Sequence, residues 1–358
     1  MLVFVSTSED GWIDGYRMDR ETGTLTPVSR TEVGRLVMPM ACGASGHHRL
    51  YAAVRSAPFT LNSYAIDPRH GTLALLGKTP PLIDNKVYLS TDQTGRFLLT
   101  ASFAGNNFAV FGIDDNGCVE PAPRQVVPIG GKAHCILVEG SNRFVYAINF
   151  GEGRIHQFRF DAETGVLTEN DPAYIQLDRA LGPRVAVLSP DTRYLYLIHQ
   201  RTGDVAQFAI DQRKGTLRHI SDTPSVPPHL DLLPASMTEN AAEANSQGAS
   251  TGDVARIWAS DIQITPNGRF LYTTERTSNT LSIFSIAPDK GTLQYVAYIE
   301  TERQPRTIAI DPSGKWLVAA GEKSDRLSVY AIDQLGGQLS LIDRYAVGRG
   351  ANWITITA

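Results

Sequence analysis

Two arginines in the same short context are the residues that most clearly suggest chemistry. Arg184 follows Gly-Pro at 182–183, and Arg306 follows Gln-Pro at 304–305, each at the start of a predicted strand. Proline fixes the backbone just before the arginine. A guanidinium group binds a carboxylate or phosphate through two parallel hydrogen bonds. The pair therefore predicts a binding site for a small anion.

His134 opens another predicted strand, where an imidazole can act as a general acid or base near neutral pH. The sequence contains no Gly-x-Ser-x-Gly elbow and no phosphate-binding glycine loop. Its three cysteines lack Cys-x-x-Cys spacing, and its His, Asp and Glu residues lack metal-ligand spacing. We expect neither a metal nor a cofactor, and we interpret the cysteines as core residues.

A repeat in the sequence predicts which strands position these residues. A phrase of the form hydrophobic-x-hydrophobic-Asp-x-x-x-Gly-Thr-Leu recurs in varied form. Its glycines are separated by 48, 46, 48, 50, 76 and 46 residues, and they are Gly23, Gly71, Gly117, Gly165, Gly215, Gly291 and Gly337. A period in the high forties is typical of a four-stranded propeller blade. The sequence predicts an all-β, seven-bladed propeller.

A second phrase, a turn followed by a basic residue and then an aromatic or leucine-rich strand, precedes the first in most repeats. The chain begins at such a second strand (LVFVST), while 351–357 (ANWITIT) has inner-strand character. We expect this C-terminal strand to close the ring by joining the N-terminal blade. The predicted inner strands begin near Pro39, Val87, His134, Arg184, Ser260, Arg306 and Asn352.

Residues 1–358 are interpreted as one domain, because a blade cannot bury its own faces without neighbours. The interval of 76 indicates a loop insertion at about 222–252, rich in Pro, Ala, Ser, Asn and Gly. It connects an outer strand to the next inner strand. Both a surface loop and a lid over the site remain open interpretations of it.

The loop that enters each inner strand and the loop between the second and third strands lie at the same propeller face. These loops are rich in basic and polar residues although the net charge of the chain is −4. We predict that the residues closest to the chemistry are His134, Arg184, Arg306, Gln200 and Glu275. We predict substrate contacts from Arg256, Trp258, Arg276, His199, Lys323, Arg349 and Asn352.

Composition limits the partners and the location. There is no long basic run, so nucleic acid and anionic membranes are not expected partners. No segment approaches the roughly 20 apolar residues that span a bilayer, and the N-terminus has no basic signal region. We expect a soluble cytoplasmic protein with a small anionic substrate, and the sequence leaves its oligomeric state open.

Four stretches resemble the lactonase family of seven-bladed propellers: 256–269 (RIWASDIQITPNGR), 304–306 (QPR), 319–324 (AAGEKS) and 345–350 (YAVGRG). This family contains bacterial propeller-type 6-phosphogluconolactonase and the fungal carboxymuconate-lactonizing enzyme. The similarity covers the whole chain and is most specific in its C-terminal third. It implies a site made of a histidine, two arginines and a glutamate around the channel mouth, where His134, Arg184 and Arg306 match.

Two positions depart from the family pattern. Val185 stands where a histidine commonly follows Gly-Pro-Arg, and His199-Gln200 stands where Asn-Glu is common. An amide cannot serve as a carboxylate base. Either another group takes that role, with Glu275, Glu152 or His199 as candidates, or the substrate differs from the family standard.

The resemblance favours a lactonase that hydrolyses a small anionic lactone, such as 6-phosphogluconolactone or a related sugar lactone. Arg184 and Arg306 would hold the anion and polarise the carbonyl, and His134 would activate water or protonate the leaving oxygen. One alternative is the reverse type of chemistry, cyclisation of a carboxymuconate. Another is a propeller that binds a metabolite or protein without turnover, because fold does not dictate function.

Overall fold

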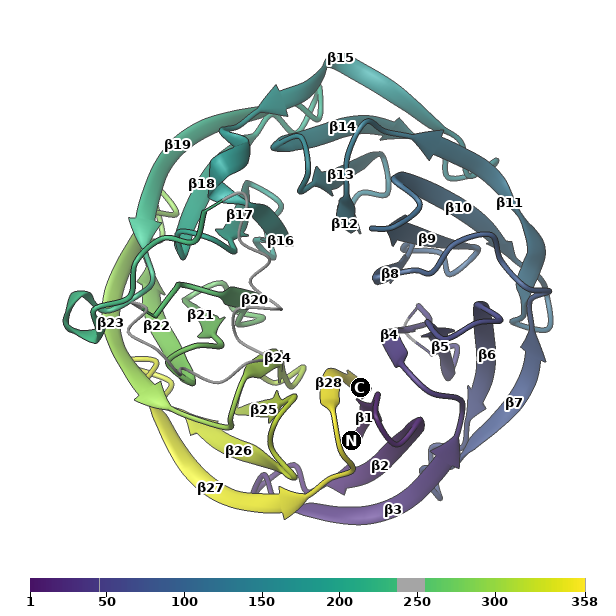
Figure 1. The fold of residues 1–358 in the computed structure, drawn as a ribbon, viewed down its shortest axis with the longest axis horizontal. Coiled ribbons are helices and arrows are strands. Elements are labelled where there is room, and N and C mark those ends of the chain that lie inside the picture. The colour runs from purple at the N-terminus through teal and green to yellow at the C-terminus, as the bar shows by residue number, and fades with distance from the viewer. Residues whose placement is uncertain (45, 237–254, 358) are drawn as a thin grey trace.

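The computed structural model describes residues 1–44, 46–236 and 255–357, and they form a ring of seven four-stranded antiparallel sheets around a central axis (Figure 1). The predicted seven-bladed propeller is therefore confirmed. Apart from strands, the described residues contain two short 3-10 helices, η1 (Arg179–Leu181) and η2 (Pro228–Leu230). Within this part of the chain no helix is long and apolar enough to cross a membrane.

The first four blades, numbered in chain order, contain the following strands. Blade I has β28 (Ala351–Thr357), β1 (Leu2–Thr7), β2 (Trp12–Met18) and β3 (Leu25–Glu32); blade II has β4 (Val37–Cys42), β5 (Arg49–Val54), β6 (Thr60–Ile66) and β7 (Leu73–Lys78). Blade III has β8 (Tyr88–Thr91), β9 (Phe97–Ser102), β10 (Asn107–Ile113) and β11 (Val119–Pro128); blade IV has β12 (Ala133–Val138), β13 (Phe144–Asn149), β14 (Arg154–Phe160) and β15 (Leu167–Gln176).

The other three blades follow the same order from the axis outward. Blade V has β16 (Pro183–Leu188), β17 (Tyr194–His199), β18 (Asp204–Ile210) and β19 (Leu217–Pro224); blade VI has β20 (Ala259–Ile264), β21 (Phe270–Glu275), β22 (Thr280–Ile286) and β23 (Leu293–Glu300). Blade VII has β24 (Pro305–Ile310), β25 (Trp316–Gly321), β26 (Arg326–Ile332) and β27 (Leu339–Ala346). Every inner strand begins within about two residues of its predicted start.

The predicted ring closure is present. β28 pairs antiparallel with β1, with Leu2 opposite Thr357 and Val5 opposite Ile354. The first and last strands of the chain thus share blade I, as the purple and yellow ribbons show in Figure 1. This pairing removes the two open sheet edges that a broken ring would expose.

Burial explains why the second strands consist mainly of hydrophobic residues. All six residues of β1, β9, β13, β21 and β25 are buried, since both faces of each blade pack against a neighbouring blade. In outer strands such as β15, exposed residues alternate with partly buried ones. The core is therefore a set of hydrophobic layers between blades rather than one central cluster.

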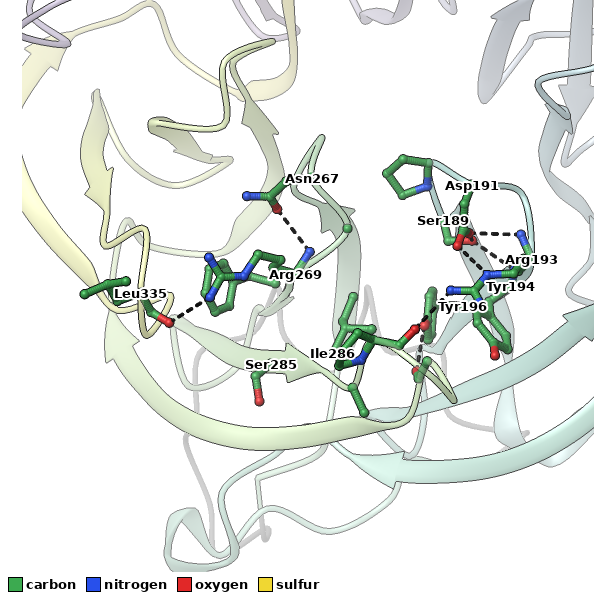
Figure 2. A pocket seen from close by; sticks show the side chains of 16 residues that line it. Ser189, Asp191, Arg193, Tyr194, Tyr196, Asn267, Arg269, Ser285, Ile286 and Leu335 are labelled. Atoms are coloured by element: carbon green, nitrogen blue, oxygen red, sulfur yellow. Dashed lines mark hydrogen bonds and ion pairs between the residues drawn. The ribbon is translucent and has the colours of Figure 1, made fainter.

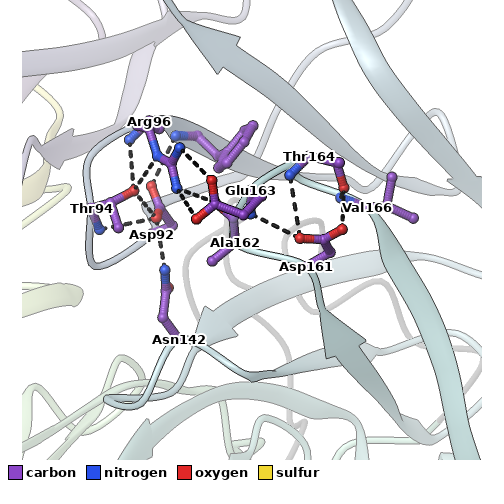
Figure 3. Close-up of polar contacts among 10 residues, drawn as sticks. Asp92, Thr94, Arg96, Asn142, Asp161, Ala162, Glu163, Thr164 and Val166 are labelled. Carbon is purple, nitrogen blue, oxygen red and sulfur yellow. Dashed lines mark hydrogen bonds and ion pairs between the residues drawn. The ribbon is translucent and has the colours of Figure 1, made fainter.

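The two recurring sequence phrases meet each other across blade boundaries. Arg96, at the start of β9, donates from Nη2 to the Ala162 carbonyl at 2.5 Å and pairs with Glu163 at 3.1 Å (Figure 3). Asp161 caps the same turn by accepting from the Glu163 backbone N–H at 2.9 Å. The basic residue of blade III thus fastens the aspartate-glycine turn of blade IV.

The glycine of the phrase packs on the aromatic residue of the preceding blade. A Cβ on Gly215, which has φ +69°, would lie 2.1 Å from the ring of Phe144. Tyr146 and Tyr272 each donate from the hydroxyl to a glycine carbonyl of the next blade, Gly215 at 3.2 Å and Gly337 at 2.8 Å. These contacts explain why both phrases repeat with the blade period.

The loop insertion begins slightly later than predicted. β19 continues to Pro224, because it pairs with β18 as far as Asp204. Residues 225–236 and 255–258 lie on either side of the undescribed part of the insertion, and Leu233 forms an isolated parallel β-bridge with Arg256. About half of the predicted insertion, residues 237–252, lies outside the described residues, so the lid prediction stays untested.

Candidate functional site

A cavity of about 270 Å³ follows the propeller axis and is bounded by the inner strands of the blades. His134, Arg184, Arg306 and Asn352 line it, as sequence analysis predicted for this face, together with Asp261. The two loop classes predicted to share one face do so. For example, the Glu322 backbone N–H donates to the Gln304 carbonyl at 3.0 Å.

Arg184 and Arg306 occupy equivalent second positions of β16 and β24, directly after the prolines that begin these strands. Arg184 is 4% exposed and donates from Nη1 to the Ser260 carbonyl, while its Nε has no partner among the described residues. Arg306 pairs with Glu322, with 3.1 Å between Nη1 and Oε1. Burial and the Arg306 charge lower the pKa of Arg184 to about 9, against the opposing charges of Asp261 and Glu322, so this group stays protonated at neutral pH.

Arg276 extends the arginine cluster from the loop after β21. Its Nε donates to the Trp258 carbonyl at 3.1 Å, and its guanidinium lies 3.6 Å from the centroid of the Trp258 ring. Its Nη2 donates to Gln200 Oε1 at 3.3 Å. Trp258 and Gln200 thus hold Arg276, and burial together with the Arg184 and Arg306 charges lowers its pKa.

His134 is the second residue of β12 and is 9% exposed. Its Nδ1 has no hydrogen-bond partner among the described residues, and its ring meets Phe103 edge-on at 6.0 Å. Burial, followed by the charges of four arginines, lowers its pKa well below the usual value. The imidazole is therefore neutral at pH 7 and able to accept a proton.

Arg55 and Glu322 also belong to this face, although sequence analysis did not single them out. The charges of both act on the cluster: burial and Arg306 lower the pKa of Arg55 to about 10, and Glu322 opposes that shift. Burial raises the pKa of Glu322, but the nearby Arg306, Arg276 and Arg184 charges outweigh it and keep the carboxyl ionised. Their place in the second-to-third loops was the available signal.

Several predicted site residues lie apart from this cluster or are engaged elsewhere. The Glu275 carboxylate accepts from the Trp258 backbone N–H at 2.6 Å and from Ser278, so it holds its own loop. His199 is 1% exposed, and burial is the main cause that lowers its pKa to about 4. The Asp222 charge on outer strand β19 opposes this shift.

The remaining predicted contacts lie at the rim or beside the insertion. Arg349 pairs with Asp10 at 2.8 Å, and Lys323 lies 3.7 Å from Glu9; both basic side chains are exposed. Arg256 donates to the Pro234 carbonyl at 3.4 Å. Asn352 is buried on the axis, where its Oδ1 accepts from Ser6 Oγ at 2.9 Å.

A larger cavity, of about 470 Å³, lies between blades V and VI at the opposite face (Figure 2). Its two arginines are engaged by inter-blade contacts: Arg193 donates to the Pro288 carbonyl at 3.0 Å, and Arg269 to the Gln334 carbonyl at 2.8 Å. Among the described residues, no group of three His, Cys, Asp or Glu is placed to hold a metal ion. The axial cluster is therefore the candidate site.

Comparison with known proteins identifies the family. A family model described as "Lactonase, 7-bladed beta-propeller" matches residues 2–356. The chain belongs to this lactonase family. A protein named 6-phosphogluconolactonase from Serratia proteamaculans (strain 568) is 34% identical over 357 residues, which cover 100% of this chain and 99% of that protein. One of the same name from Pectobacterium carotovorum is 33% identical over 357 residues, covering 100% and 98%.

Solved structures support the same lactonase fold. The structure named as the periplasmic gluconolactonase of Pseudomonas aeruginosa matches with a TM-score of 0.84 and 23% identity, covering 100% of this chain and 99% of that chain. At this identity the likeness establishes the fold alone. The family membership suspected from the sequence is confirmed by the family model and by the relatives at 33–34% identity.

Proposed function

We propose that this chain hydrolyses the ring of a small anionic sugar lactone, with 6-phosphogluconolactone as the first candidate substrate. One observation carries the proposal: Arg184 and Arg306 line the axial cavity beside His134, and the charges of Arg276 and Arg55 also act on this histidine. Arg306 forms an ion pair with Glu322. Such a cluster suits a phosphate or carboxylate. The names of the relatives at 33–34% identity support the same substrate class.

The arginines supply both binding and carbonyl polarisation in this proposal. Arg184 and Arg306 both reach the axial cavity, so one binds the anionic group of the substrate while the other donates to the carbonyl oxygen. Negative charge grows on that oxygen as water attacks the carbonyl carbon. Donors that are already fixed around the oxygen stabilise this charge without reorganisation.

His134 moves the proton. Its neutral imidazole takes a proton from the attacking water, whose oxygen bonds to the carbonyl carbon. Collapse of the tetrahedral intermediate breaks the bond between this carbon and the ring oxygen, which then receives the proton from His134. A bound anion raises the low pKa of His134 by offsetting the arginine charges that depress it, and this makes the imidazole a stronger base in the complex.

The two alternatives are less favoured. No relative reported above is named for muconate cyclisation, and Gln200 is engaged as an acceptor for Arg276. A propeller that only binds a metabolite would not need a histidine with a free ring nitrogen at the centre of the cluster.

The test is the rate of ring opening above the spontaneous rate. Freshly prepared 6-phosphogluconolactone, gluconolactone and a muconolactone would be offered to the wild type and to Arg306→Ala. We expect the wild type to accelerate ring opening of the phosphorylated lactone. The enzymatic rate should be about 100-fold lower, or lower still, in Arg306→Ala. No acceleration of any lactone by the wild type would contradict the proposal.

A further inference from the structure

We propose that Glu322 sets the charge of the site so that it favours the lactone over the acid formed from it. This inference rests on the proposed function. It assigns to Glu322 a role in selectivity and product release, which neither the repeat pattern nor the lining of the axial cavity indicates.

The geometry places the Glu322 carboxylate beside Arg306, and Asp261 is a second carboxylate that lies in the cavity lining and acts on Arg184. Glu322 follows β25 and pairs with Arg306 at 3.1 Å, and the two side chains are 22% and 19% exposed. Its second carboxylate oxygen takes part in no hydrogen bond among the described residues. The carboxylate also acts electrostatically on Arg55, Arg184 and Arg276. The Glu322 charge therefore acts on Arg306 directly and on the other three arginines electrostatically.

Hydrolysis changes the charge of the ligand by one unit. Water adds to the lactone, the ring carbon–oxygen bond breaks, and the new carboxylic acid ionises and releases its proton at neutral pH. The product thus carries the anionic group of the substrate and one additional carboxylate. In a site with arginines alone, the product would bind more tightly than the substrate and would occupy the site.

Glu322 opposes this effect. Its fixed charge repels the new carboxylate in a partly buried setting, where screening by water and salt is weaker than at the surface. The lactone carbonyl has no charge and does not meet this repulsion. Glu322 therefore weakens binding of the acid more than binding of the lactone.

The experiment measures binding without turnover. Isothermal titration calorimetry would compare 6-phosphogluconate with glucose 6-phosphate, which carries the same phosphate but no carboxylate, on wild type, E322Q, E322D and E120Q. Glu120 is a matched control because it also pairs with an arginine, Arg124, at 2.5 Å, but on outer strand β11. We expect E322Q to increase the affinity for both ligands unequally. The increase for 6-phosphogluconate should be on the order of tenfold larger than the increase for glucose 6-phosphate.

E322D keeps the charge and should retain the wild-type ratio of the two affinities, as should E120Q. Equal changes for both ligands in E322Q, or no change, would overturn the inference. If E322Q does not fold, the affinities of the wild type and of E322D are compared instead. The inference would also be overturned if the wild type binds 6-phosphogluconate more tightly than glucose 6-phosphate and E322D shows the same ratio of affinities. Loss of the proposed function is seen separately, as the absence of lactone hydrolysis by the wild type.

Discussion

At the scale of single residues, the position of a side chain along a strand was predictable and its direction was not. His134, Arg184 and Arg306 were found from sequence because the repeat fixes where inner strands begin. Glu275 was predicted from the same reasoning, yet its carboxylate turns into its own loop and accepts from Trp258 and Ser278. That choice depends on local backbone donors, which a repeat pattern does not encode.

Substitution of His134 tests its proposed role in proton transfer. We expect His134→Gln to lower kcat by about 100- to 10,000-fold with little change in KM, because the arginines that bind the anion remain. His156→Gln is the control: His156 is also buried with a lowered pKa, but it lies on β14 rather than on the axis. Equal loss of activity in both variants would point to a general structural effect.

The pH profile of the wild type gives an independent measure of the same group. Burial and four arginine charges lower the pKa of His134, so the free enzyme keeps a neutral imidazole below pH 6.5. We expect kcat/KM to stay level as the pH falls from 8 to about 6 and to decline only at lower pH. A decline centred at or above pH 6.5 would contradict an arginine-depressed histidine.

At the scale of elements, the sequence phrases were recognised as repeats, but their partnership across blades became visible only in three dimensions. The aromatic residue of one blade lies against the glycine of the next, as Phe144 does against Gly215. The two are far apart in sequence, so composition and spacing alone do not reveal their contact. The blade period is thus kept by contacts between neighbouring repeats as well as by pairing within each repeat.

A methyl group added at this contact should be costly. Gly215→Ala places a Cβ 2.1 Å from the Phe144 ring at a φ of +69°, and we expect a loss of about 2–4 kcal/mol in the free energy of unfolding. Gly46→Ala is the control, since Gly46 also has a positive φ of +85° but no atom within 4 Å of the added Cβ. Denaturant unfolding of both variants would separate the clash from the backbone strain.

At the scale of the whole molecule, stability depends on closing the ring. Removal of residues 351–358 deletes β28, leaves the edge of β1 unpaired and takes Asn352 from the axial cavity. We expect this variant to aggregate or to lose cooperative unfolding, as seen by size-exclusion chromatography and circular dichroism. Truncation after Ile356 is the control, because most of the β1–β28 pairing remains.

Buried histidines make the stability of the ring depend on pH. Burial lowers the pKa of His156 and His199 to about 4, whereas the unfolded chain titrates near 6.5. Between these values the unfolded state binds more protons, so stability falls as the pH is lowered through this window. We expect a loss of up to about 3 kcal/mol for each histidine by pH 4. His199→Gln should reduce the slope measured by denaturant unfolding at several pH values.

The pairing of β1 with β28 also has a consequence for synthesis. Translation delivers β1 long before β28, because their partner residues Leu2 and Thr357 are separated by most of the sequence. While the ribosome is still extending the chain, blade I therefore lacks its innermost strand. The nascent protein therefore carries an unpaired β1 edge until β28 has been synthesised, and this edge is open to aggregation during that time.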